Sequence, residues 1–180
     1  KSFRPSGGGP PNHVLRNVTL QVPHGCLYGL IGPSGSGKSV LLKMISGLMK
    51  PDHGRIVVDG DDVTSASELD LQRIRLKLGM LFQNNALFDY LTVAENIAFP
   101  LRRAGKLDEQ AIRAKVADRL QVVSLPDFGD RMPAGLSGGQ KKRIGVARAT
   151  VAASSIVLYD EPAAGLDPVA DPRRLVVLEH

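Results

Sequence analysis

A glycine-rich segment followed by a lysine and a serine is the first part of the sequence that could do chemistry. Gly32, four free positions, and then Gly37, Lys38 and Ser39 satisfy the phosphate-loop pattern. The glycines let backbone N–H groups wrap an anion, and the lysine and serine suit phosphate oxygens and Mg²⁺. A glycine-rich surface turn is the alternative. The predicted phosphate-binding residues are Gly32, Pro33, Ser34, Gly35, Ser36, Gly37, Lys38 and Ser39.

Two carboxylates at the end of an apolar run form the second candidate. Residues 155–159 are typical of a buried strand, and Asp160 and Glu161 follow directly. Strand-end aspartates hold Mg²⁺ in nucleotide-hydrolysing enzymes, so we assign Asp160 to the metal. Glu161 could accept a proton from an attacking water. The alternative is that both residues simply face solvent at a strand end.

The pentapeptide Leu136-Ser137-Gly138-Gly139-Gln140 is a third candidate. Ser137 and Gln140 have the spacing of a capping box, which predicts that a helix begins here. Bare N–H groups at a helix start bind phosphate, and glycines allow close approach. An ordinary helix start, with Ser137 as cap and the glycines allowing a tight entry, is the alternative.

Strands and helices must position these segments. After a loop rich in Gly and Pro, the predicted strands are 18–22, 26–31, 55–58, 79–82 and 155–159, with a turn at Asp59-Gly60. The predicted helices are 40–48, 69–76 and two longer ones, which begin at Asp108 and at Ser137. In the helix from Asp108, apolar residues recur at the spacing of one helix face; they are Ile112, Val116, Leu120 and Val123. Strand-rich flanks therefore enclose a helical insert.

Composition excludes several protein classes. The 180 residues are 43% apolar and 23% charged, without an apolar run of the roughly 18 residues that a membrane span needs. The single cysteine, Cys26, excludes an intrachain disulfide and fits a reducing compartment. Secretion is not expected, because no secretory pattern opens the sequence.

The net charge of +5 is unevenly distributed. Residues 101–150 hold eleven Lys and Arg against five Asp and Glu. Nucleic acid is not the expected partner, because this block has Phe128 as its one aromatic residue. The surplus indicates either solvated helix faces or an anionic or protein partner.

Taken together, the motifs resemble those of the nucleotide-binding subunit of ABC transporters, in the right order over nearly the whole chain. They are the phosphate loop, Gln83 after a short strand, the pentapeptide 136–140, the strand ending in Asp160-Glu161, and Gly165-Leu166-Asp167. The resemblance implies an α/β fold: a P-loop NTPase (RecA-like) core, an inserted helical subdomain and a small β-rich N-terminal part. It divides the chain into core (1–83), helical subdomain with the signature motif (84–153) and core again (154–180).

The resemblance also implies roles for single residues. ATP and Mg²⁺ would be the cofactors, with Glu161 as general base and Gln83 sensing the γ-phosphate and the metal. Ser39, Gln83 and Asp160 would hold the metal. Ser137, Gly138, Gly139 and Gln140 would contact ATP held by a second copy in a head-to-tail dimer, with Asp167 at the seam. Phe3 matches an aromatic that stacks on adenine, although simple apolar packing is the alternative.

The resemblance further implies membrane partners. The segment after Gln83 would dock an integral permease subunit, so the expected location is the cytoplasm, peripheral on the inner face of the bacterial cell membrane. Leu87, Phe88 and Tyr90 either line that docking groove or form the core of the helical insert. Segments 37–43, 79–89 and 91–101 look most like the ATPases of Mla- and Mce-type lipid transporters.

One feature departs from the family pattern. The family has a histidine at the end of a further strand, well beyond Asp167, and His180 follows Asp167 too soon for that role. The core is therefore expected to lack its last layer and to be C-terminally truncated, or to end in an expression tag. An ATP-binding fragment deficient in hydrolysis, an ABC ATPase for another substrate, and a soluble ABC ATPase outside transport remain alternatives. His13, His24 and His53 are assigned to the surface.

Overall fold

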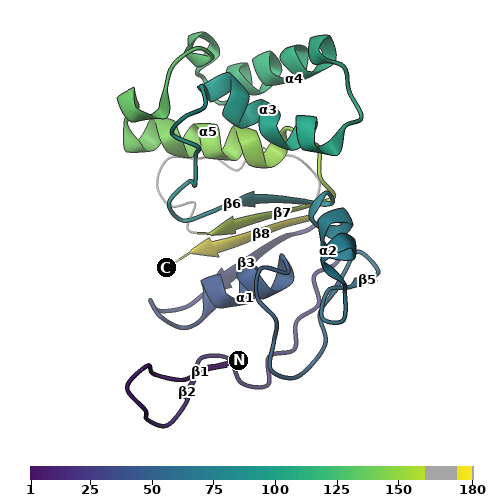
Figure 1. Ribbon diagram of the computed structural model, residues 1–180, viewed down its shortest axis with the longest axis vertical. Helices are drawn as coiled ribbons and strands as arrows, with labels where there is room; N and C mark the ends of the chain where they lie inside the picture. The colour runs from purple at the N-terminus through teal and green to yellow at the C-terminus, as the bar shows by residue number, and fades with distance from the viewer. Residues whose placement is uncertain (161–173, 180) are drawn as a thin grey trace.

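A four-stranded parallel sheet forms the centre of the fold in the computed structural model, which describes residues 1–160 and 174–179. Its strands are β3 (Leu27–Ile31), β8 (Arg174–Glu179), β7 (Ile156–Asp160) and β6 (Leu78–Leu81), in that order across the sheet (Figure 1). Because all are parallel, their carboxyl ends share one edge, where the phosphate loop and Asp160 both lie.

The position of β8 corrects an expectation from the sequence. The core does have a strand beyond the Asp167 region, and it pairs with β3 on one side and with β7 on the other. The short distance between Asp167 and His180 does not exclude such a strand. The apolar run 175–178 is itself typical of a central parallel strand. His180 lies outside the described residues.

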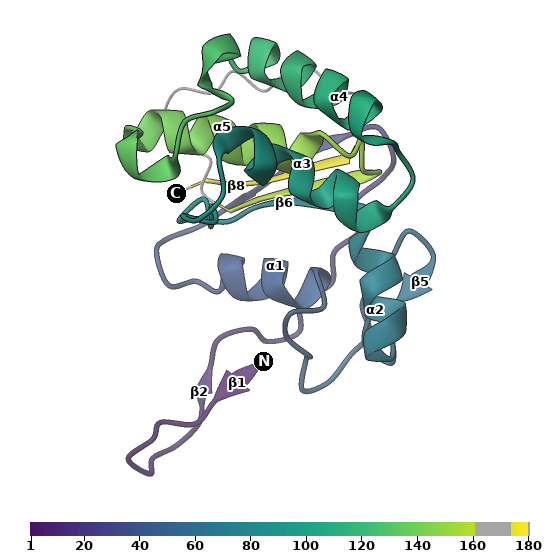
Figure 2. The same ribbon diagram turned by 45° about the horizontal axis from the view of Figure 1, so that its top comes forward.

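Two helices and a small hairpin cover one face of the sheet. Helices α1 (Lys38–Ile45) and α2 (Glu68–Arg75) lie on this side, opposite the other helices (Figures 1 and 2). Strands β4 (Val57–Val58) and β5 (Asp61–Asp62) pair through the predicted Asp59-Gly60 turn. Leu42, Leu71 and Leu158 bury their side chains together between these elements and the sheet. This core fixes α1, and with it the phosphate loop, against β7.

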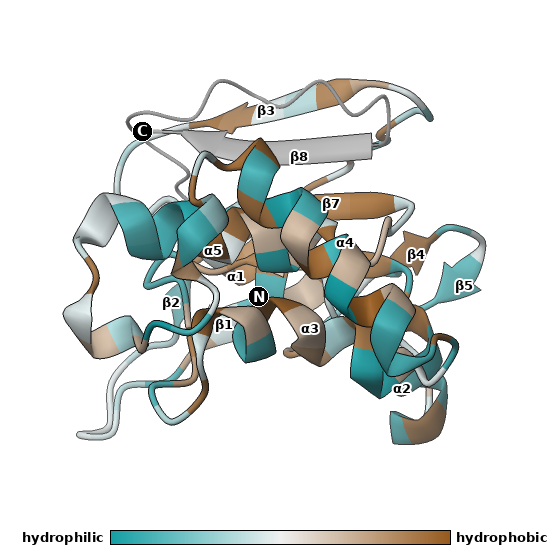
Figure 3. Ribbon diagram, turned by 90° about the horizontal axis from the view of Figure 1, so that it is seen from above, coloured by the Kyte–Doolittle hydropathy of each residue, from teal (hydrophilic) through white to brown (hydrophobic). Residues whose placement is uncertain are grey.

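Three longer helices form a second layer on the opposite face. They are α3 (Val93–Ala104), α4 (Glu109–Val122) and α5 (Gly138–Thr150), with 3-10 turns at Pro126–Phe128 and Pro133–Gly135. The amphipathic helix predicted after Asp108 is confirmed, because Ile112, Val116 and Leu120 are buried in the core of this layer. In Figure 3 polar and apolar residues alternate around α4, whereas β7 is almost uniformly apolar.

Helix α5 belongs to both layers. Ile144 and Ala147 pack in the helical core, whereas Val146 and Ala149 pack against Leu81 of β6 in a separate apolar cluster. Because α5 packs against both layers, its contacts do not mark where the helical subdomain ends. The predicted subdomain boundaries at residues 84 and 153 stay a prediction. In the described part of the chain, no helix is both long and apolar enough to cross a membrane.

The N-terminal region is less regular than the sequence predicts. Strands β1 (Ser2–Phe3) and β2 (Asn12–His13) form a short hairpin that projects from the body (Figure 2). The strand predicted at 18–22 is wrong, because this segment has no strand partner among the described residues and Val18 is 52% exposed. A β-favouring sequence needs a neighbouring strand before it forms a ladder.

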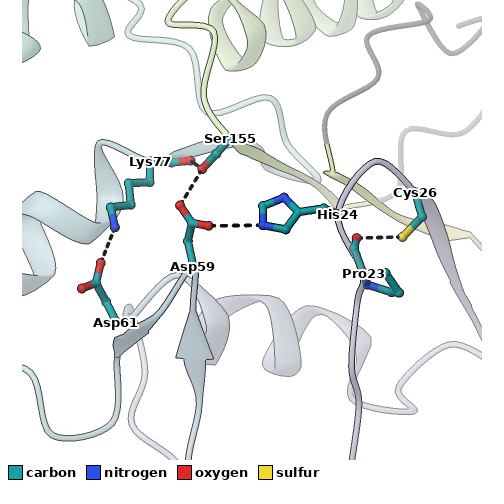
Figure 4. Close-up of polar contacts among 7 residues, drawn as sticks. All are labelled: Pro23, His24, Cys26, Asp59, Asp61, Lys77 and Ser155. Atoms are coloured by element: carbon teal, nitrogen blue, oxygen red, sulfur yellow. Dashed lines mark hydrogen bonds and ion pairs between the residues drawn. The ribbon is translucent and has the colours of Figure 1, made fainter.

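A polar cluster fastens the hairpin β4–β5 to the amino end of β7 (Figure 4). Ser155 Oγ donates to Asp59 Oδ2 over 3.4 Å and to the backbone oxygen of Lys77 over 3.2 Å, and Lys77 Nζ contacts Asp61 Oδ2 at 2.5 Å. His24 lies 3.8 Å from Asp59 and is exposed, as are His13 and His53. These contacts lie at the end of β7 opposite Asp160, so they hold the fold together away from the candidate site.

Candidate functional site

The phosphate-loop residues connect β3 to α1, as predicted. Gly37 precedes the helix with φ of 97°, a conformation that side chains other than Gly rarely adopt. A Cβ on Gly37 would also lie 2.8 Å from Val14 Cγ1 and 2.9 Å from Leu15 Cδ2. Both the backbone conformation and the lack of space therefore require glycine where the loop enters the helix.

Lys38 closes over its own loop. Its Nζ donates to the backbone oxygens of Gly32 at 2.7 Å and Pro33 at 3.1 Å, and the residue is only 7% exposed. No side chain of the described residues caps the first turn of α1, so its N–H groups are left for another acceptor. A buried cation beside uncapped N–H groups makes this loop suited to an anion.

Ser39 and Asp160 bring two oxygen ligands together from distant parts of the chain. Ser39 Oγ donates to Asp160 Oδ1 over 2.8 Å, across 121 positions of sequence. Asp160 is the last residue of β7 and is 4% exposed. Hydroxyl and carboxylate oxygens are the ligands that Mg²⁺ prefers, so this pair fits the metal that the sequence predicts.

The predicted capping box at α5 is present. Gln140 N donates to Ser137 Oγ at 3.3 Å, and Ser137 N donates to Gln140 Oε1 at 2.9 Å. Gly138 and Gly139 are exposed, and no atom comes within 4 Å of where their Cβ atoms would be. The helix start is therefore ordered by its cap and open to a large ligand.

Other predicted residues lie around the same edge or outside the described residues. Gln83 is exposed in the turn that follows β6. Phe3 is 37% exposed on β1, and Lys1 Nζ lies 5.7 Å from its ring centroid. The backbone oxygen of Lys1 accepts from Val14 and Leu15, the residues that pack on Gly37, so this hairpin begins beside the phosphate loop. Glu161 and Asp167 lie outside the described residues.

A pocket of about 600 Å³ lies between the sheet layer and the helical layer. Phe88 lines this pocket and stacks at 4.8 Å on Phe99, whereas Leu87 packs against the helical core. Tyr90 is 76% exposed. Leu87 therefore packs in the core of the helical insert, and Phe88 lines a pocket whose role as the docking groove stays a prediction.

Comparison with known proteins identifies the family. The sequence profile described as ABC transporter matches residues 15–164, which include the phosphate loop, Asp160 and the pentapeptide at α5. The chain belongs to the ABC transporter family.

Its relatives include transport ATP-binding proteins. It is 45% identical over 158 residues to the probable ribonucleotide transport ATP-binding protein mkl of Mycobacterium leprae, which covers 88% of this chain and 46% of mkl. It is 45% identical over 168 residues to the methionine import ATP-binding protein MetN 2 of Pseudomonas aeruginosa, covering 93% of this chain and 50% of that protein. The chain thus spans about half the length of these curated relatives.

Solved structures support the ABC cassette fold. The dimeric ATP-binding cassette MJ0796, in a post-hydrolysis state bound to ADP and Pi, superposes with a TM-score of 0.91 at 31% identity. The match covers 100% of this chain and 84% of that one. The expected fold class, a P-loop NTPase core with an inserted helical layer, is confirmed.

Sequence reasoning missed two polar residues of this ABC cassette, a buried asparagine and a partly buried arginine. Asn96 of α3 is fully buried, and Arg148 of α5 donates to backbone oxygens of the turn after Gln83. Each could have been found from its position on an otherwise apolar helix face. Asn96 lies three positions after Val93 and three before Phe99, and Arg148 follows Ile144 by four positions. A polar residue at such a position usually satisfies buried backbone groups.

Proposed function

We propose that this chain is the ATP-binding and ATP-hydrolysing subunit of an ABC transporter. The contact between Ser39 Oγ and Asp160 Oδ1, 2.8 Å long at the base of the phosphate loop, carries the proposal. It joins the two halves of a nucleotide site that are far apart in sequence. The ADP and Pi in the similar MJ0796 structure support ATP as the nucleotide.

In this function each residue acts through a group that the structure describes. Lys38 would exchange the carbonyls of Gly32 and Pro33 for the β and γ phosphates, which neutralises part of their charge. Ser39 and Asp160 would hold Mg²⁺, which offsets the negative charge that develops on the transferred phosphoryl group. Glu161, one residue beyond Asp160, would take the proton of the attacking water.

A second copy of the chain would complete the site. Because Gly138 and Gly139 expose the start of α5, the γ-phosphate bound by one copy could meet the N–H groups of the other. The similar MJ0796 structures are dimeric, which supports the head-to-tail pair. Asp167 at the seam, Gln83 at the metal and Phe3 on adenine belong to the same proposal.

The pocket between the two layers would receive the membrane partner. Its lining includes the aromatic residues Phe82, Phe88 and Phe99 and five basic residues, and none of its described lining residues is acidic. The five are Arg75, Arg103, Lys106, Lys115 and Arg148. Arg75 already pairs with Glu68 and Arg148 donates to backbone oxygens, so Arg103, Lys106 and Lys115 are the cations that would meet a partner. Such a pocket suits an amphipathic permease segment that carries acidic residues. The basic surplus of residues 101–150 then serves a protein partner, with the subunit peripheral on the inner face of the membrane.

The transported substrate is the finer part of the proposal. Segments 37–43, 79–89 and 91–101 look like those of lipid-transporter ATPases, which favours a lipid. The relatives carry other names, ribonucleotide transport and methionine import. Because the described site binds the nucleotide and not the cargo, transport assays with all three substrate classes must choose among them.

Glu161→Gln tests the hydrolytic function. Losing a positioned general base should lower the rate of phosphate release by about 10²- to 10⁴-fold while ATP stays bound. The substitution should also trap an ATP-bound dimer, which gel filtration detects.

Glu109→Gln is the matched control, because Glu109 is a surface carboxylate that pairs with Arg102. It should leave phosphate release unchanged. Full turnover in the Glu161 variant would show that the base assignment is wrong, and a wild-type chain that releases no phosphate would point to a fragment that only binds ATP.

A further inference from the structure

The turn after Gln83 has a backbone conformation that needs outside support. Asn85 and Ala86 are consecutive and have φ of 59° and 46°, the left-handed region that residues other than Gly seldom occupy. Asn85 Oδ1 is buried and has no hydrogen-bond donor among the described residues. Such conformations persist only where surrounding contacts hold them, so the contacts of this turn are the ones to identify.

Arg148 of α5 supplies those contacts. Its Nη2 donates to the backbone oxygen of Asn85 at 2.6 Å, and its Nη1 donates to that of Ala86 at 2.8 Å. The guanidinium carbon also lies 5.9 Å from the ring centroid of Phe88. No carboxylate in the described part of the chain forms an ion pair with Arg148, and burial lowers the pKa of its guanidinium. This charge is therefore committed to two carbonyl groups of the turn.

Asn96 fixes the other end of the same segment. It is fully buried, accepts from Phe88 N at 2.8 Å, and donates to the backbone oxygens of Phe88, Leu91 and Thr92 at 3.0 to 3.1 Å. Helices α3 and α5 share one apolar core through Ile97, Ile144 and Ala147. The segment from Asn85 to Thr92 is thus fastened at both ends to the helical layer.

We propose that Arg148 is a positioning residue that couples the start of α5 to Gln83. Helix α5 is 13 residues long, begins at the capped Ser137 end and carries Arg148 in its last turn. If the start of α5 shifts when a second copy's ATP binds there, Arg148 would move with the helix. Its hydrogen bonds would carry that movement to the carbonyls of Asn85 and Ala86, two and three residues after Gln83. The inference rests on the proposed function, since it assigns Gln83 and Ser137 to one nucleotide cycle.

The guanidinium group is essential to this role. Its planar fork places two N–H groups at fixed angles, which matches two successive carbonyls. A lysine at this position keeps the charge but offers a single rotatable ammonium group. Arg148→Lys therefore removes the fixed orientation and leaves the charge, which makes it the most informative substitution.

The test compares ATP binding with turnover in the full chain, without permease, so that a lost permease contact cannot account for the result. Arg148→Lys should leave the Kd for ATP within about twofold and lower kcat by about tenfold to hundredfold, as small misplacements of catalytic groups do. Hydrogen exchange of the amides 84–88 should become faster in the same variant before ATP is added. Arg148→Gln, which can reach one carbonyl only, should give the same split and replaces the lysine variant if that one does not fold.

Arg143→Lys is the matched control. Arg143 lies on the same helix and donates to a carbonyl, that of Val123 at 3.3 Å, but this carbonyl belongs to the helical layer and not to the Gln83 turn. Its substitution should change neither kcat nor the exchange at 84–88.

The possible outcomes distinguish a failure of the coupling from a failure of the proposed function. If the wild type hydrolyses ATP and both Arg148 variants keep its kcat and its exchange pattern, the coupling is wrong and the proposed function stands. If Arg143→Lys lowers kcat equally, Arg148 has a general structural role and the inference is overturned. A wild-type chain that binds no ATP overturns the proposed function and the inference with it. If the wild-type chain binds ATP without hydrolysing it, hydrogen exchange is the only test: faster exchange at 84–88 in the Arg148 variants supports the coupling, and unchanged exchange contradicts it.

Discussion

The five helices of the described chain begin in two different ways. Helices α2, α3 and α4 start with a capping side chain and carry acidic residues in their first turns. In α3 the backbone N–H of Thr92 lowers the pKa of the Glu95 carboxyl, which shows how the helix start favours an anion. The first turns of α1 and α5 have no acidic residue.

This difference sets α1 and α5 apart as the helix starts that we propose to bind a ligand. The partial positive charge at a helix start attracts the nearest anion. In α2, α3 and α4 that anion is the helix's own carboxylate. In α1 and α5 it would be a phosphate, which α1 would meet with its own Lys38 and α5 would meet only when a second copy presents it. Three substitutions at the starts of α1 and α5 test whether that contrast is real.

Of these substitutions, Lys38→Ala should have the largest effect on ligand binding, because it removes the cation at the start of α1. Two charge-assisted hydrogen bonds to phosphate are worth about 3 kcal/mol in total, so the Kd for ATP should rise by at least about 100-fold. Titration with a fluorescent ATP analogue measures it.

Lys43→Ala is the control on the same helix, since Lys43 is exposed in the last turn of α1. It should bind ATP as the wild type does. Unchanged affinity in the Lys38 variant would show that this helix start is not a phosphate site.

Gly138→Asp should have the next largest effect, because it gives α5 the acidic first turn of α2, α3 and α4. The side chain has room, so the fold should be kept, but a carboxylate would repel the phosphate brought by the second copy. ATP-driven dimerisation should weaken at least about tenfold while ATP binding to the monomer stays the same. Analytical ultracentrifugation measures the first and titration the second.

Gln121→Glu places the same charge on the exposed side of α4 and should change neither quantity. If both variants dimerise as the wild type does, the open start of α5 has no role in the dimer.

Ser137→Ala should have the smallest effect. Losing a helix cap costs about 1 kcal/mol of unfolding free energy, measured by denaturant titration. Ser67→Ala removes the corresponding cap of α2 and should cost a similar amount. The two variants should differ only in ATP-driven dimerisation, which the Ser137 variant alone should weaken. If both variants dimerise equally weakly, the loss of dimerisation is explained by the lower stability of the fold and not by a phosphate contact at α5.

Local patterns predicted the chemistry-bearing parts well. The phosphate loop, the capping box of Ser137 and Gln140, and the strand that ends at Asp160 each depend on residues close together in sequence. For the same reason the Asp59-Gly60 turn and the amphipathic α4 were found. Each is decided by backbone conformation or by one helix face.

The remaining parts of the fold were harder to predict, because they depend on pairing between segments that are far apart in sequence. The segment 18–22 has a strand-like sequence but no strand beside it in the described part of the chain, whereas 175–178 became a strand because β3 and β7 lie on either side. Both segments have strand-like sequences, so the sequence alone does not show which of them finds a neighbouring strand. The position of Arg148 four residues after Ile144 could have marked it as a polar residue on an apolar helix face. Its partners could not have been predicted, because they are backbone carbonyls 62 and 63 positions away and carbonyls carry no sequence signal.

The insertion of β8 between β3 and β7 also bears on how the chain acquires its shape. The strand before the phosphate loop and the strand before Asp160 share no hydrogen bonds and are joined only through β8, which comes later in the chain than either. Contacts between such distant segments form slowly, because a long loop must close first. On a ribosome, α1 and its glycine loop would emerge early and remain exposed until β8 is made. The strand order therefore predicts that the phosphate loop is fixed against Asp160 only after β8 has paired with β3 and β7.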